Sequence, residues 1–161
     1  MIEHRVTIAR HAVERAPGRL VTVGLGSCVV IAIHDAKAQV GAVAHVLLPH
    51  SSAGPHSGVG EHPARYCDTA VPLLVKTLKM HGAEGPYTAK LAGGAALFAD
   101  ILAAKGGVGE RNIAAARAAL AAEQIPIIAE DVGGTAGRSV SFDVGTGALA
   151  VRRPSGEAHV V

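Results

Sequence analysis

Cys28 follows directly after a glycine-rich turn, an arrangement that is typical of a nucleophile. Gly24 and Gly26 let the backbone bend and bring its N–H groups together. Converging N–H groups beside a thiol can stabilise an oxyanion, so Gly26 and Ser27 are candidates for that part of a site. From this segment alone, a buried and unreactive cysteine is the better interpretation, because free cysteines are among the most buried residues.

His45 lies within the otherwise apolar segment 40–48 and strengthens the case for chemistry. An unpartnered imidazole there would cost roughly 1–3 kcal/mol. If segments 28–33 and 40–48 pair as a hairpin, His45 lies towards the Cys28 end, where it could lower the thiol pKa and act as a base. Thr22, at the end of the preceding strand, could orient the imidazole. The alternative is a core histidine bonded to a backbone carbonyl, and spacing alone does not decide between them.

Other motifs argue less strongly for chemistry. Several potential metal ligands follow one another along the chain, namely His45, His50, His56, His62 and Cys67. Their spacings do not match compact zinc signatures, so we predict no metal and no other cofactor. The glycine-rich segment 131–138 lacks the GxxxxGK[ST] pattern of a phosphate loop, which argues against nucleotide binding. Structural roles are expected for Arg138 and Asn112.

The composition limits the classes of function. The chain has 161 residues, of which 49% are hydrophobic and 17% charged, and this balance suits one folded domain over residues 1–161. The net charge is only +2, without blocks of like charge, so we expect no nucleic-acid surface. Neither a signal peptide nor an apolar run of the ~20 residues that cross a bilayer is present. We therefore predict a cytoplasmic protein with reduced thiols and no membrane insertion.

The pattern of apolar residues predicts a mixed α/β (α+β) fold, with largely antiparallel sheets layered with helices. Alternation and β-branched residues predict strands over 5–9, 20–24, 28–33, 40–48, 87–91, 125–129, 139–144 and 148–152. Helical spacing predicts helices over 63–80 and 109–122, the first kinked or split by Pro72. The segment 49–63, rich in Gly and Pro, predicts a long loop of the kind that often forms a lid or binding segment.

Short segments along the chain also carry a resemblance to a known family. They are Thr22, GLGSC at 24–28, AHVLLP at 44–49, YCDTA at 66–70, AKLAGGA at 89–95, VGERN at 108–112, DVGGTAGR at 131–138 and the turn at 146–147. In this order they closely resemble the chemoreceptor glutamine deamidases, the CheD family, over roughly residues 5–153. Any one segment is a weak signal, whereas the ordered set is specific.

The resemblance implies a CheD-like cysteine hydrolase domain in which Cys28 is the nucleophile, His45 the base and Thr22 the third member. The implied activity is that of a protein-glutamine glutaminase. The thiolate attacks a glutamine carboxamide in the cytoplasmic domain of a chemoreceptor, ammonia leaves, and water hydrolyses the thioester to glutamate. Glutamate methyl esters are a further implied substrate. An alternative implied role is that of a non-catalytic partner and regulator of a CheC-type chemotaxis phosphatase.

Overall fold

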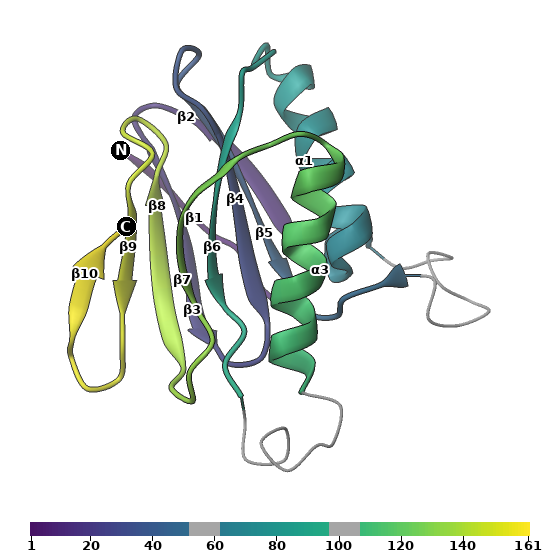
Figure 1. The fold of residues 1–161 in the computed structure, drawn as a ribbon. Coiled ribbons are helices and arrows are strands. Elements are labelled where there is room, and N and C mark those ends of the chain that lie inside the picture. The colour runs from purple at the N-terminus through teal and green to yellow at the C-terminus, as the bar shows by residue number, and fades with distance from the viewer. Residues whose placement is uncertain (52–61, 97–106) are drawn as a thin grey trace.

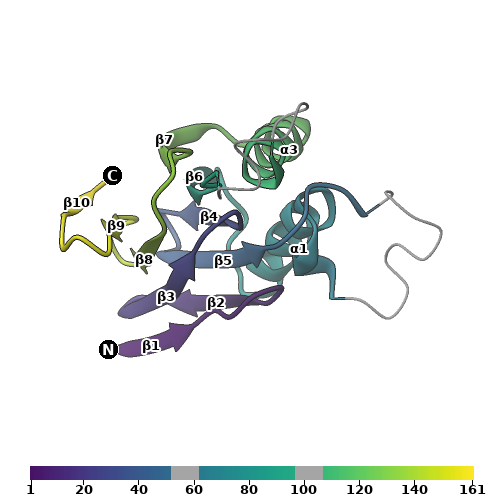
Figure 2. The same cartoon turned by 90° about the horizontal axis from the view of Figure 1, so that it is seen from below.

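The computed structural model describes residues 1–51, 62–96 and 107–161, which form three layers (Figures 1 and 2). One sheet lies between a second sheet and a pair of helices. The elements in chain order are β1 (Ile2–Arg5), β2 (His11–Arg15), β3 (Gly18–Leu25), β4 (Val29–Asp35), β5 (Val40–Val46), a 3-10 turn (Pro63–Arg65), α1 (Cys67–Met80), β6 (Thr88–Gly93), α3 (Val108–Ala122), β7 (Ile127–Val132), β8 (Arg138–Asp143), β9 (Leu149–Arg152) and β10 (Ala158–Val160).

Both sheets are mixed and largely antiparallel, which confirms the predicted fold class. The outer sheet has the strand order β1-β3-β8-β9-β10, with β1 parallel to β3. The central sheet has the order β2-β5-β4-β6-β7, with β6 parallel to β7. Its middle strands β4 and β5 form the predicted hairpin, in which Val30 pairs with His45.

The central sheet is buried on both faces, and this explains the continuous apolar runs of β4 and β5. Since successive side chains point to opposite faces, Ile31 and Ala44 pack against the helices, whereas Val30 and Val43 pack against the outer sheet. Cys28 belongs to the layer between the two sheets, with Val30. The nucleophile candidate therefore lies on the face away from the helices.

Some sequence-based expectations about the elements were wrong. β1 ends at Arg5, where a strand over 5–9 was predicted, because the chain turns and Ala9 adopts a φ of 60°. Pro72 lies inside one continuous helix, and the predicted break falls instead at Tyr66, whose backbone is extended. Burial of one face of α1 evidently outweighs the backbone hydrogen bond that Pro72 cannot make.

The sequence also predicted a long loop over 49–63 and no membrane-spanning segment. Most of the predicted loop 49–63, including His56, falls outside the described residues. In the part of the chain that is described, no helix is long and apolar enough to cross a membrane.

Candidate active site

Cys28 lies at the end of the turn that joins β3 to β4, next to the end of β6 and the first turns of α3. Figure 1 shows these elements. The backbone of this turn is fixed by the turn that follows β6. The Gly26 carbonyl accepts a hydrogen bond from the Ala95 N–H at 2.9 Å, and the Cys28 carbonyl accepts one from the Gly94 N–H at 2.8 Å. Cys28 is a free thiol with 7% of its surface exposed.

Two glycines allow this close approach. Gly93 and Gly94 have φ values of 102° and 70°, a region that favours glycine. A Cβ atom on Gly93 would lie 2.3 Å from the Cys28 carbonyl oxygen, closer than two such atoms can come. The paired glycines thus let the chain after β6 hold the turn that carries Cys28.

The N–H groups of this turn are available for a ligand. Those of Gly26 and Ser27 donate no hydrogen bond to any residue within 1–51, 62–96 and 107–161, whereas the carbonyls of Gly26, Ser27 and Cys28 all accept one. With its carbonyls directed into the protein, the turn can offer its N–H groups to an oxyanion beside the sulfur. The oxyanion role of Gly26 and Ser27 stays a prediction.

His45 lies on the same face of the central sheet as Cys28. It pairs with Val30 in β4, and Cys28 directly precedes the first residue of that strand, so the two side chains are diagonal neighbours at the end of the hairpin. Such neighbours lie about 7–8 Å apart at the backbone, within reach of long and aromatic side chains. No hydrogen bond joins Cys28 and His45 among the described residues, although both are buried.

A backbone carbonyl links His45 to Thr22. The Thr22 hydroxyl donates to the Val6 carbonyl at 3.2 Å, and Nδ1 of His45 lies 3.4 Å from the same oxygen. Because a carbonyl oxygen only accepts, Nδ1 must carry the proton, and Nε2 of the neutral ring is left as a base. Thr22 and His45 therefore share one acceptor rather than contacting each other, and His45 is bonded to a backbone carbonyl, as the alternative interpretation expected.

Burial keeps both reactive groups neutral. It raises the pKa of the Cys28 thiol, an effect that the backbone N–H of Cys28 partly opposes. It lowers the pKa of His45, and the bond to the Val6 carbonyl partly opposes this change. The expected lowering of the thiol pKa is thus not found in the resting state.

Two of the other potential metal ligands, Cys67 and His62, have partners of their own. Cys67 lies in the helix-side core, and its thiol donates to the Asn112 carbonyl at 3.5 Å. His62 accepts a hydrogen bond from the Ala64 N–H and packs against the ring of His11. Residues 1–51, 62–96 and 107–161 contain no group of three or more side chains that could hold a metal ion.

The segment 131–138 has a structural role, because its only arginine is buried. Arg138 forms an ion pair of 2.6 Å with Asp131 and also donates to the Gly133 carbonyl. The Gly133 N–H in turn donates to the Gly93 carbonyl at 2.9 Å. This segment therefore supports the turn after β6, which itself supports Cys28.

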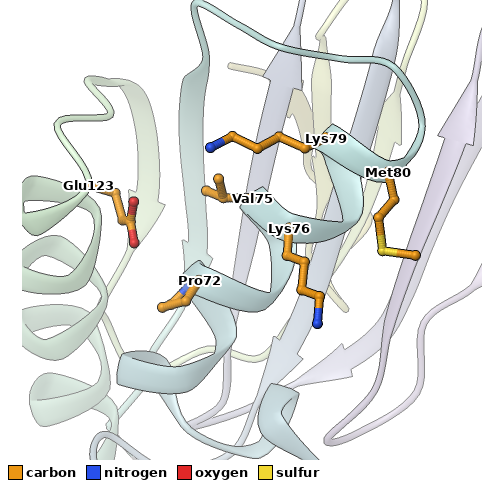
Figure 3. A pocket seen from close by; sticks show the side chains of 6 residues that line it. All are labelled: Pro72, Val75, Lys76, Lys79, Met80 and Glu123. Carbon is orange, nitrogen blue, oxygen red and sulfur yellow. The ribbon is translucent and has the colours of Figure 1, made fainter.

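A groove on the helices lies away from these residues (Figure 3). It is lined by Pro72, Val75, Lys76, Lys79, Met80 and Glu123. These residues belong to the middle and C-terminal part of α1 and to the C-cap of α3, whereas the segment that carries Cys28 contacts the N-terminal turns of the helices. The groove contains none of the predicted site residues, so Cys28 and its neighbours remain the candidate active site.

Comparison of the sequence with those of known proteins shows the family of this chain. Residues 47–153 match the model of a family described as CheD chemotactic sensory transduction. The chain is 43% identical over 153 residues to the chemoreceptor glutamine deamidase CheD of Thermotoga maritima, covering 94% of this chain and 92% of the relative. It is 46% identical over 149 residues to a probable chemoreceptor glutamine deamidase, CheD 2, of Geobacter metallireducens, covering 91% of each chain. The family match begins after Thr22, Cys28 and His45, whereas the relatives align over most of the chain.

Proposed function

The chain belongs to the CheD family, and on that premise we propose that it deamidates glutamine side chains of chemoreceptors, with Cys28 as nucleophile. His45 is the base in this proposal and Thr22 its positioning partner. The substrate class follows from relatives that carry the name chemoreceptor glutamine deamidase. The geometry of the turn and the hairpin supports the proposed roles of the residues.

The observation that carries the proposal is the shared Val6 carbonyl. It binds Nδ1 of His45 and the Thr22 hydroxyl, and so leaves Nε2 of this buried imidazole without a partner among the described residues. His45 pairs with Val30, which packs in the same layer as Cys28. A buried histidine with a fixed tautomer, next to a thiol and unpaired N–H groups, has the components that acyl transfer needs.

In the proposed reaction, Nε2 of His45 takes the thiol proton as the sulfur of Cys28 attacks the carboxamide carbon. The N–H groups of Gly26 and Ser27 hold the oxyanion. The imidazolium then protonates the departing nitrogen, and ammonia leaves behind a thioester. Water, deprotonated by His45, hydrolyses the thioester to glutamate and restores the thiol.

The same site would act on glutamate methyl esters, because acylation then differs only in the leaving group. We place the protein in the cytoplasm, where the free thiol of Cys28 would stay reduced. We also propose that residues 1–161 act as one domain, since β4 and β5 contribute side chains to both apolar layers. A CheC-type phosphatase is a proposed partner.

The experiment incubates the wild type, Cys28→Ala and Cys67→Ala with a chemoreceptor cytoplasmic fragment, and follows ammonia release and the mass of the receptor peptides. Wild type and Cys67→Ala should convert glutamine to glutamate, and Cys28→Ala should not. Full activity in Cys28→Ala would end the nucleophile assignment. Tight binding of a CheC-type phosphatase by a wild type that never turns over receptor would favour the non-catalytic role.

A further inference from the structure

Asn112 in α3 joins the two segments that carry the nucleophile and the base. Its side-chain NH₂ group donates to the Ser27 carbonyl at 3.0 Å and to the Leu47 carbonyl at 3.1 Å. Ser27 directly precedes Cys28, and Leu47 lies two residues after His45. We propose that Asn112 is a positioning residue for the deamidation proposed above, on which this inference rests.

The bridge lies where the strands stop pairing. The ladder between β4 and β5 ends at the pair Val29 and Val46, nearest the site. Beyond it the N–H of Leu47 turns away and donates to the Arg65 carbonyl. Among the described residues, no backbone hydrogen bond of this ladder joins the Cys28 turn to the chain after Val46, and the Asn112 amide supplies that link.

The orientation of the amide is fixed by its partners. Both acceptors are carbonyl oxygens, so only the NH₂ group can face them, and Oδ1 must point elsewhere. Oδ1 is buried and has no partner among the described residues. An unpaired buried acceptor is unfavourable for folding. We attribute the use of an amide here to the double donor that it provides.

α3 can reach the site because of one glycine. A Cβ atom on Gly109, one turn before Asn112, would lie 2.4 Å from the Ala95 carbonyl and 2.6 Å from the Gly94 carbonyl. The helix thus packs directly on the turn that holds the Cys28 backbone. The backbone carbonyl of Asn112 accepts a hydrogen bond from the Cys67 thiol, with a sulfur–oxygen distance of 3.5 Å. This bond links α1 to the same residue.

The test compares Asn112→Ala, Asn112→Ser and Asn112→Asp with Leu120→Ala. The carboxylate of Asn112→Asp has nearly the same shape as the amide but cannot donate to two carbonyls. Leu120 is fully buried in the same helix, so its truncation measures the effect of a damaged helix core alone. The readouts are kcat and KM on a receptor cytoplasmic fragment, thermal unfolding, and the pH profile of Cys28 alkylation by iodoacetamide.

We expect Asn112→Ala and Asn112→Asp to lower kcat by about 100-fold with little change in KM, because a small misplacement of reacting groups can cost that much. The alkylation profile of Cys28 should shift in these variants. Leu120→Ala should lose thermal stability and keep both kcat and the profile. If Asn112→Ala and Asn112→Asp do not fold, Asn112→Ser decides, because one hydroxyl cannot bridge both carbonyls.

Folded Asn112 variants with the wild-type kcat and alkylation profile would overturn the inference while leaving the deamidase proposal intact. A wild type that does not deamidate the receptor fragment would instead overturn the proposed function. The alkylation profiles would then still report whether Asn112 positions Cys28, since they need no substrate.

Discussion

The two faces of the central sheet each bury a free cysteine, and the two thiols differ in their surroundings. Cys67, on the helix side, donates to the Asn112 carbonyl, and burial raises its pKa to about 12. Cys28, between the sheets, has no such acceptor among the described residues and shares its face with His45, the proposed base. Because both side chains are buried, we expect the groups next to each thiol to decide which sulfur can react.

The largest effect is expected from removing the base. His45→Gln should lower kcat by about 10³-fold, since positioned general bases contribute about 10²- to 10⁴-fold. The matched control is His34→Gln. His34 is also a buried histidine, with a ring nitrogen 2.7 Å from the Val144 carbonyl, but it lies towards the other end of β4. Ammonia release measures kcat in both variants. Equal losses of kcat would mean that His45 is no special neighbour of Cys28, and the proposed difference between the two cysteines would lose its basis.

Alkylation of the native protein at about pH 8 tests the comparison directly. With a pKa of about 12, only about one in 10⁴ Cys67 thiols is ionised there. Cys28 should be labelled at least about 100-fold faster, as measured by peptide mass spectrometry, because His45 can accept its proton. Protein unfolded in urea is the control, in which both thiols should react alike. Faster labelling of Cys67 in the native state would reverse the assignment.

A smaller effect is expected at Thr22. Thr22→Val keeps the shape but loses the hydroxyl that binds the Val6 carbonyl. One hydrogen bond contributes about 1 kcal/mol, so kcat should fall about fivefold if that bond positions His45. Thr22→Ser keeps the hydroxyl and should retain most activity. Steady-state kinetics with both variants would refute the role of Thr22 if Val and Ser behave identically.

The smallest effect concerns stability at acid pH. Burial lowers the folded-state pKa of His45 below its unfolded value of about 6.5. Between these two values the unfolded chain binds more protons, so the free energy of unfolding falls as the pH is lowered through this range, and it is unaffected above it. Urea unfolding at about pH 7.5 and 5.5 measures the loss. His45→Gln should lose less stability than the wild type, and an equal loss would contradict the assignment.

The local parts of the site could be predicted from the sequence. The hairpin of β4 and β5 follows from two apolar, β-branched segments with a short polar link, and it brings His45 towards Cys28. Gly26 and Ser27 could be recognised because glycines before a cysteine indicate a turn with free N–H groups. These features depend on residues close together in the chain, where periodicity is informative.

The long-range parts could not be predicted. Every residue has a carbonyl, so nothing in the sequence marks that of Val6 as the acceptor for His45 and Thr22. The amide of Asn112 reaches Ser27 across 85 residues, a contact that only the packing of α3 creates. The strand β2 was missed because its mixed polar residues do not alternate clearly, and it forms by pairing with β5.

The shared acceptor at position 6 makes part of the proposed machinery invisible to mutational scanning. Every substitution of Val6 keeps the carbonyl that His45 and Thr22 bind. A change in the path of the backbone at β1 could displace this carbonyl, because Val6 directly follows β1, which pairs with β3. An expression tag or a deletion that disturbs the first residues should therefore impair turnover, although the sequence still contains Cys28, His45 and Thr22.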